Sequence, residues 1–181
     1  MARLDAATSC TRCELSLTRQ RVVIGSGEVG AALVIVGEAP GRSEDEGGQP
    51  FIGRSGQLLF RLIGEEIGLT REECYVTNVV KCRPPKNRPP RVRELRACGI
   101  WWDLQLAQMS PRVIMTLGNT ASRAVLGTDA KIGDIHGRVH EVDGRVVIPT
   151  YHPAAGLRAG PNVVDVMRED LRKIRQHLGT S

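Results

Sequence analysis

The stretch Ala32-Leu33-Val34-Ile35-Val36-Gly37-Glu38-Ala39-Pro40-Gly41 decides the fold of this chain. Its first half is a short apolar run, and the glycine and proline that follow end it, which is the pattern of a buried strand opening into a loop. In an open parallel sheet, ligands bind at the carboxyl ends of the strands. We therefore expect a site for a planar polar molecule in the loop up to Gly53; the alternative is an acidic surface loop. The polar and aromatic side chains of that loop include Glu38, Glu44, Asp45, Glu46 and Phe51.

Apolar runs and helical periodicity alternate along the rest of the chain. Further strands are predicted at 74–80 and 112–118, and a hairpin through Asp143-Gly144 at 139–148. Helices are predicted at 57–68, 92–109, 119–126 and 162–178. Strands separated by helices indicate an α/β fold with helices on both faces of a parallel sheet. A chain of 181 residues with 41% hydrophobic content fits one domain, residues 1–181.

The charge balance favours an anionic partner. The formal net charge is +5, and arginine is strongly preferred to lysine. Arginine suits planar two-pronged binding of phosphate, although a GC-rich genome produces the same preference. Two Pro-Pro pairs, at 84–85 and 89–90, predict an extended basic loop suited to a phosphate backbone. Its basic side chains are Lys81, Arg83, Lys86, Arg88, Arg91, Arg93 and Arg96.

No apolar segment has the length of a signal peptide core or of a membrane span, so we expect a cytoplasmic protein that does not contact membranes. We also expect a monomer.

Four of the five cysteines are candidate metal ligands. Cys10 and Cys13 form a C-x2-C pair, and Cys82 and Cys98 are separated by fifteen residues. Without a secretory signal, a metal role is favoured over a disulfide, and spacing alone fits zinc, a 4Fe-4S cluster or no metal. Cys74 lies inside a predicted buried strand and is expected to be a core residue.

Several segments together resemble the family 4 uracil-DNA glycosylases, the thermostable iron-sulfur branch of that superfamily. They occur in the family's order and extend from Cys10 to Arg158. The matching segments are Gly37-Glu38-Ala39-Pro40-Gly41, Glu44-Asp45, Pro50-Phe51-Ile52-Gly53, Gly56-Gln57-Leu58-Leu59, 77–85 (Thr-Asn-Val-Val-Lys-Cys-Arg-Pro-Pro), Asn87-Arg88 and 149–154 (Pro-Thr-Tyr-His-Pro-Ala).

The resemblance implies a three-layer α/β/α sandwich around a four-stranded parallel sheet. It also implies a 4Fe-4S cluster on Cys10, Cys13, Cys82 and Cys98, and hydrolysis of the N-glycosidic bond of uracil in DNA, leaving an abasic site. The nucleotide is flipped out of the stack for this chemistry. No lysine falls in the proposed uracil pocket, so we expect a monofunctional glycosylase without a lyase step.

The resemblance also implies roles for individual residues in the pocket. Phe51 stacks on uracil, unless it is only a core residue, and the amide of Asn78 pairs with uracil N3-H and O4, unless it only caps a turn. His152 donates to uracil O2 as a neutral imidazole. Glu38 and Glu44 are the candidates for holding the water and stabilising the cationic sugar. The classical uracil glycosylases have aspartate where Ala39 stands beside the uracil, so here the water is expected on Glu38 or on backbone groups, and Asn87 is expected to support Glu38 or the water.

DNA contacts are expected from Lys81, Arg83, Lys86, Arg88 and Arg91, and from the Leu157-Arg158 pair. The last two residues lie in the loop that enters the duplex in this superfamily, where an apolar wedge fills the vacated space. Simple loop packing is the alternative. Three departures from the family pattern are Gly156 in the wedge loop, His136 before Gly137, and Arg42 beside the acidic loop.

Uracil-containing DNA, single-stranded or double-stranded, is therefore the expected partner. Two other functions fit the same residues. One is a noncatalytic uracil-DNA binder on this fold, which would bind tightly without releasing the base. The other is a zinc-stabilised basic adaptor, which would contain zinc without iron or sulfide.

Overall fold

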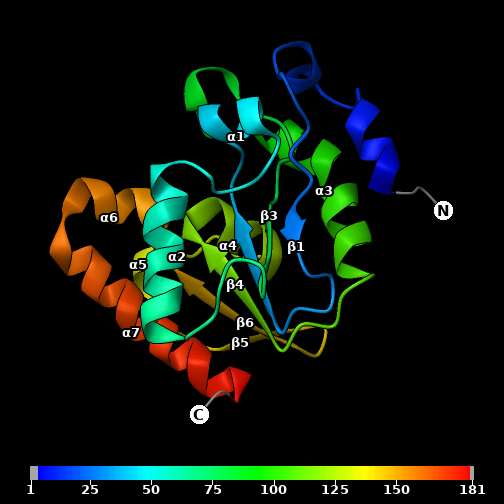
Figure 1. Cartoon of the computed structure of the whole chain (residues 1–181). Coiled ribbons are helices and arrows are strands. Elements are labelled where there is room, and N and C mark those ends of the chain that lie inside the picture. The colour runs from blue at the N-terminus through cyan, green and yellow to red at the C-terminus, as the bar shows by residue number, and fades with distance from the viewer. Residues whose placement is uncertain (1–3, 180–181) are drawn as a thin grey trace.

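A six-stranded sheet runs through the middle of the computed structural model, which describes residues 4–179 (Figure 1). The strand order is β1-β3-β2-β4-β6-β5. The four central strands are parallel to one another, whereas the short β1 and β5 pair antiparallel with β3 and β6 at the two edges. The strands are β1 (Ser26–Gly27), β2 (Leu33–Gly37), β3 (Tyr75–Asn78), β4 (Val113–Leu117), β5 (His140–Val142) and β6 (Arg145–Thr150).

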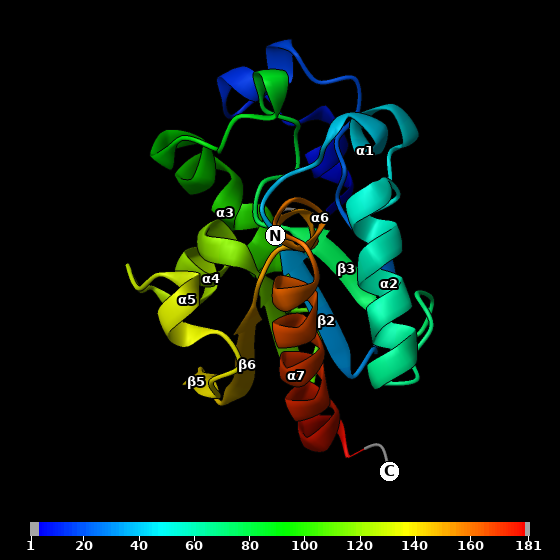
Figure 2. The same cartoon turned by 90° about the vertical axis from the view of Figure 1, so that its left-hand side faces the viewer.

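Helices cover both faces of the sheet, which confirms the expected α/β fold. The view turned by 90° shows α7 lying across one face, with α2 beside it (Figure 2). The α-helices are α1 (Arg42–Gly47), α2 (Arg54–Glu66), α3 (Val92–Leu106), α4 (Gly118–Leu126), α5 (Ile132–Ile135), α6 (Pro153–Ala159) and α7 (Pro161–Leu178), and the 3-10 helices are η1 (Leu4–Ser9), η2 (Glu14–Leu17) and η3 (Pro85–Asn87).

Alternation along the strands explains the two cores. Side chains of successive strand residues point to opposite faces, so Leu33 and Ile35 pack in a core with α2 and α7, whereas Val34 and Val36 pack in a core with α3 and α4. Because helices cover both faces of the sheet, residues 33–36 of β2 form one continuous apolar run. Cys74 is fully buried in the first of these cores, as expected.

The sheet is larger than the four strands expected, because two short edge strands extend the parallel part. The edge strand β5 comes from the predicted hairpin. Asp143 and Gly144 have φ angles of 49° and 73°, the left-handed pair that a two-residue type I′ turn requires.

Two segments expected to be loops contain helices instead. Residues 42–47 form α1 inside the acidic loop, and residues 153–159 form α6 after the last strand. Both are short, and neither carries the apolar periodicity by which the longer helices were predicted. Within residues 4–179, no helix has the length and apolar character needed to cross a membrane.

Candidate active site

The predicted uracil-binding side chains meet around Gly37, the last residue of β2. Gly37 pairs with Asn78 at the end of the neighbouring strand β3. A Cβ atom built on Gly37 would lie 2.6 and 2.8 Å from two ring carbons of Phe51 and closer still to Oδ1 of Asn78. The ring centroid of Phe51 is 5.8 Å from that of His152. Glycine at position 37 therefore creates the space in which three elements bring Asn78, Phe51 and His152 together.

Asn78 presents an amide without a partner among the described residues. It is only 2% exposed, and its side chain makes no hydrogen bond there. Its main-chain carbonyl, by contrast, accepts a hydrogen bond of 2.6 Å from Nζ of Lys81. Among the described residues the only fully enclosed side-chain nitrogen or oxygen without a partner is Nε2 of His140, so the amide of Asn78 keeps a small opening through which a ligand can reach it. The geometry thus leaves one donor and one acceptor free for a bound molecule.

Phe51 lies in a backbone conformation that bulky residues rarely adopt. Its φ angle is 54°, in the left-handed region. The ring is 7% exposed and packs at the edge of the core formed with α2. It therefore contacts that core and the neighbourhood of Gly37 together, so the packing and stacking interpretations are compatible.

His152 is the N-cap of α6, and this cap fixes its tautomer. Its Nδ1 accepts a hydrogen bond of 3.1 Å from the backbone N–H of Ala154, so in the neutral ring the proton is on Nε2. Burial, with a smaller effect from Arg158, lowers the pKa of His152 from 6.5 to about 4. At neutral pH the side chain is therefore an uncharged imidazole that can donate from Nε2.

The two candidate carboxylates have different surroundings. Glu38 follows Gly37, is partly buried, and accepts a hydrogen bond from the hydroxyl of Thr120 in α4. Glu44 uses both oxygens on loop backbone, accepting from Gly41 N at 3.1 Å and from Gly53 N at 2.8 Å. The Glu44 carboxylate thus joins the two ends of the acidic loop, whereas one oxygen of Glu38 has no partner among the described residues.

Lys81 was expected to contact DNA, and the structure contradicts this. It is 1% exposed, and Nζ donates to Thr77 Oγ1 at 2.7 Å, to the carbonyl of Asn78, and to the side-chain oxygen of Gln105. Because its ammonium group is enclosed behind the end of β3, it cannot reach a phosphate. Lys81 is the first residue of the basic loop, so its burial could not be predicted from the sequence. The loop becomes exposed only a few residues later.

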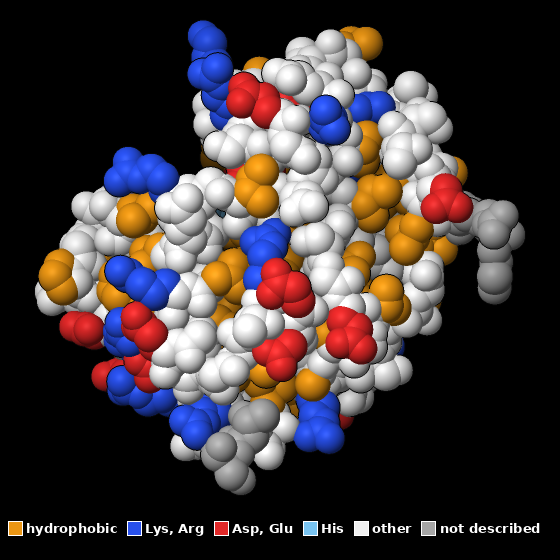
Figure 3. Space-filling view, in the orientation of Figure 1, with side chains coloured by type: hydrophobic (Ala, Val, Ile, Leu, Met, Phe, Trp, Pro, Cys, Tyr) orange, Lys and Arg blue, Asp and Glu red, His pale blue; other side chains and the backbone are white. Residues whose placement is uncertain are grey.

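The other basic side chains differ in how much they are neutralised. Arg88 forms a two-pronged pair with the buried Glu94, at 2.6 and 2.8 Å. Arg91 and Arg93 both contact Glu14 of η2, at 2.7 and 2.6 Å, yet remain exposed. Figure 3 shows acidic and basic side chains interspersed on the face it presents. Lys86 is exposed, and Arg83 is partly buried.

Asn87 is exposed, and its side-chain oxygen accepts a 2.7 Å hydrogen bond from Nε of Arg83. Its expected support of Glu38 or of the water stays a prediction.

The predicted wedge residues lie on α6. Leu157 is 45% exposed and Arg158 is exposed beside it. Gly156 is buried, and a Cβ there would lie 3.0 Å from Val164 of α7 and 3.5 Å from Leu58 of α2. Glycine at this position lets α6 pack against α2 and α7, so the outward apolar side chain is Leu157. In Figure 3 the surface is indented between the regions of α1 and α6.

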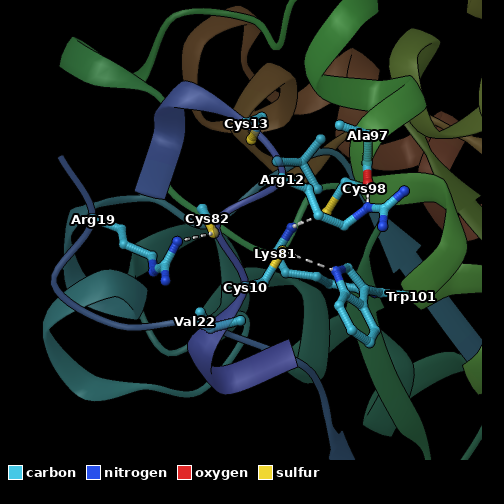
Figure 4. A pocket seen from close by; sticks show the side chains of 11 residues that line it. Cys10, Arg12, Cys13, Arg19, Val22, Lys81, Cys82, Ala97, Cys98 and Trp101 are labelled. Carbon is cyan, nitrogen blue, oxygen red and sulfur yellow. Dashed lines mark hydrogen bonds between the residues drawn. The ribbon is translucent and has the colours of Figure 1, made fainter. Parts of the chain in front are cut away.

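Four cysteines line one pocket beside the basic loop (Figure 4). Cys10 and Cys13 come from the N-terminal segment, Cys82 follows β3, and Cys98 lies on α3. Among the described residues, no group of three or more His, Cys, Asp or Glu side chains could hold a metal ion as the side chains stand. The four thiols nonetheless share a single concave, largely apolar surface with Val22, Val80 and Trp101.

Three nitrogen donors point at sulfurs of this pocket. Trp101 Nε1 lies 3.3 Å from Cys10 Sγ, the backbone N of Lys81 lies 3.3 Å from Cys98 Sγ, and Arg19 Nη1 lies 3.7 Å from Cys82 Sγ. Such donors stabilise thiolates and tune metal-sulfur centres. The donor set therefore fits a sulfur-ligated group.

Sequence reasoning missed Thr120 and the burial of Lys81. Thr120 lies in the first turn of a predicted helix, where a threonine carries no signal that it contacts a carboxylate 82 positions away. Gln105, which accepts from Lys81, lies in the last turn of α3, where it likewise carries no signal of this contact. Both contacts depend on the packing of helices against the sheet.

Comparison with known proteins adds an independent finding. The family model described as the uracil DNA glycosylase superfamily matches residues 24–175. Cys10 and Cys13 precede this matched region.

Curated relatives include a type-4 uracil-DNA glycosylase of Sulfurisphaera tokodaii, 40% identical over 95% of this chain and 81% of the relative. A type-4 uracil-DNA glycosylase of Thermotoga maritima is 42% identical over 96% of this chain and 92% of the relative. A type-5 uracil-DNA glycosylase of Pyrobaculum aerophilum is 32% identical over 84% of this chain and 75% of the relative.

Proposed function

We propose, from the premise that this chain belongs to the uracil DNA glycosylase superfamily and within it to the type-4 family, that it excises uracil from DNA in repair. The observation that carries the proposal is that the neutral His152 and the unpartnered amide of Asn78 both lie beside the Phe51 ring at the end of β2. We expect the whole chain to act as one domain and as a monomer on uracil-containing DNA, single-stranded or double-stranded.

Recognition of uracil falls to Asn78 and Phe51. The amide oxygen accepts from N3-H of the flipped base, and the amide NH2 donates to O4. Cytosine presents the opposite pattern at both positions, so the same amide rejects it. The Phe51 ring supplies the stacking surface, and Ala39 lines the base beside Glu38.

Bond cleavage separates charge between the sugar and the base. As the C1′–N1 bond breaks, its electron pair moves onto uracil, and Nε2–H of His152 hydrogen-bonds O2 where the negative charge collects. A neutral donor is sufficient because the base leaves as an anion. The water oxygen then bonds to C1′, and one water proton passes to Glu38 or to solvent.

We assign the water-holding role to Glu38 rather than Glu44. The Thr120 hydroxyl binds one oxygen of Glu38, which leaves the other for a water. Glu44 instead fixes the loop by its two backbone contacts. The negative charge of both groups favours the cationic sugar.

For the four cysteines we propose a 4Fe-4S cluster in preference to zinc. A single zinc ion needs all its ligands within about 2.3 Å of one point. In a four-iron cluster each thiolate binds a different iron, so four sulfurs spread around one pocket suit it better. The cluster, when bound, would tie the N-terminal segment to both ends of the basic loop; the excision itself uses none of its chemistry.

DNA contacts are proposed for Arg83, Lys86 and Arg91 of the basic loop, with Arg88 mainly supporting the loop through Glu94. Leu157 is proposed as the wedge and Arg158 as its flanking phosphate contact. Each phosphate contact that is lost should reduce the salt dependence of DNA binding by about 0.9 in the slope of log K against log salt.

The function is tested with single-stranded and duplex oligonucleotides that contain one uracil. After incubation, hot alkali should cut the strand at the uracil position, and free uracil should appear in equal amount. The same oligonucleotide with cytosine is the control. Absence of both products with metal-loaded protein would refute the proposal. Stoichiometric zinc without iron or sulfide in the purified protein would refute the cluster separately.

A further inference from the structure

Arg71 forms an unusual contact with the loop that carries Phe51. Its Nη1 donates to the carbonyl of Phe51 at 2.9 Å, and Nη2 donates to the carbonyl of Pro50 and lies 3.4 Å from Ser26 Oγ. The guanidinium carbon lies 4.7 Å from the centre of the Phe60 ring on α2. One arginine thus binds two successive carbonyls of the loop while resting on the helix that follows it.

The residue that Arg71 holds is the strained one. A left-handed φ is strained at phenylalanine and persists only where the surroundings determine it. Gly56 contributes to this, because a Cβ at that position would overlap the Phe51 carbonyl. The Gly53 amide bonded to Glu44 fixes the loop two residues further on.

We propose that Arg71 is a positioning residue that fixes the Phe51 ring for stacking on the flipped uracil. The inference rests on the proposed function, since it gives the ring its task. Arg71 does not itself touch the base; it holds the Pro50 and Phe51 carbonyls so that the ring lies beside Asn78 and His152. Without it, the backbone of Phe51 relaxes toward ordinary φ values and the ring leaves that position.

The activity test is a double-mutant cycle with Arg71→Gln and Phe51→Ala. Arg71→Gln alone should lower kcat/KM for uracil release by about 10- to 100-fold. In the Phe51→Ala background the same change should have less than about a twofold effect, because no ring is left to place. Arg71→Lys, which keeps a donor for one carbonyl, should recover part of the activity. Equal losses in both backgrounds would overturn the proposal.

A second measurement does not depend on activity. Amide hydrogen exchange in a peptide covering residues 48–56 should accelerate in Arg71→Gln, while a peptide from 58–63 in α2 should keep its protection. Arg168→Gln is the matched control, because Arg168 pairs with Glu65 and Glu66 at the other end of α2. It removes an arginine of α7 that also contacts α2 but does not touch the loop, and both exchange in 48–56 and activity should stay normal.

The two measurements distinguish failure of the proposed function from failure of the positioning role of Arg71. If the wild-type protein releases no uracil, the proposed function is wrong, and the exchange of residues 48–56 alone decides the structural part. Unchanged exchange there in Arg71→Gln overturns the positioning role even when the wild-type protein is fully active.

Discussion

Replacing Gly37 by alanine should abolish most of the activity while leaving the fold intact. The new Cβ would be 2.6 Å from a Phe51 ring carbon, where 3.4 Å is ordinary contact, so the ring must retreat by about 0.8 Å (3.4 − 2.6), and Asn78 must move as well. Displacement of the Asn78 amide removes its two hydrogen bonds to uracil, which are worth about 1 kcal/mol each. The weakened stack adds about 1 kcal/mol more. Together, about 3 kcal/mol corresponds to a fall of roughly 150-fold in kcat/KM.

The assay is initial-rate uracil release from a single-stranded oligonucleotide, with thermal unfolding measured alongside. Gly64→Ala is the matched control, because Gly64 is exposed in the last turn of α2 and the nearest neighbour of its new Cβ would be 4.0 Å away. That variant should keep full activity and gain about 0.5–1 kcal/mol of stability. A Gly37→Ala protein that is folded and as active as the wild type would refute our placement of the uracil site.

Three further outcomes are expected. Asn78→Asp should narrow the preference for uracil over cytosine, because a carboxylate cannot donate to O4 but can accept from a cytosine amino group; an unchanged ratio of release rates would contradict its role. Because the pKa of His152 is about 4, protonation of this ring should not reduce kcat/KM between pH 6 and 8. Its effect should appear only toward pH 4, and folding stability should fall as the pH drops from about 6.5 to about 4. A ring titration by NMR with a midpoint near 6.5 would be inconsistent with this. Glu94, 0% exposed with a pKa lowered to about 2 mainly by Arg88, stabilises the fold fully above pH 4.5 and loses its effect as the pH falls through 2. Glu94→Gln should therefore cost about 1–3 kcal/mol at pH 7 in chemical denaturation and little near pH 2, because the guanidinium of Arg88 that it leaves behind is partly exposed.

The sheet could be predicted from sequence because its strands are buried on both faces. A run such as Leu33 to Val36 has no other stable location than the middle of the fold, and the long helices show their apolar faces directly. The short helices could not be predicted in this way. The acidic residues of α1 bind backbone or pair on the surface, as Glu44 does with Gly41 and Gly53 and Glu46 does with Arg42, so their pattern is that of a polar loop.

For the site, the sequence predicted the residue types but not which of their side chains are free to bind a ligand. Glu38 and Glu44 are the same residue type in the same loop, and only the backbone contacts of Glu44 distinguish their roles. Lys81 has the sequence context of a phosphate contact, whereas packing against Gln105 and Thr77 encloses it. Phe51 could be placed in the loop, but its left-handed backbone depends on Arg71, twenty residues later.

The bond between Ala154 N and His152 Nδ1 has a consequence for fidelity. It makes the imidazole part of α6, the same short helix that bears Leu157. A duplex that does not accept Leu157 would hold that helix back, and the hydrogen-bond donor to uracil O2 would then be withdrawn from the base as well. Entry into the stack and readiness for cleavage would thus be a single movement, so that a base is cut only where the helix has been able to enter.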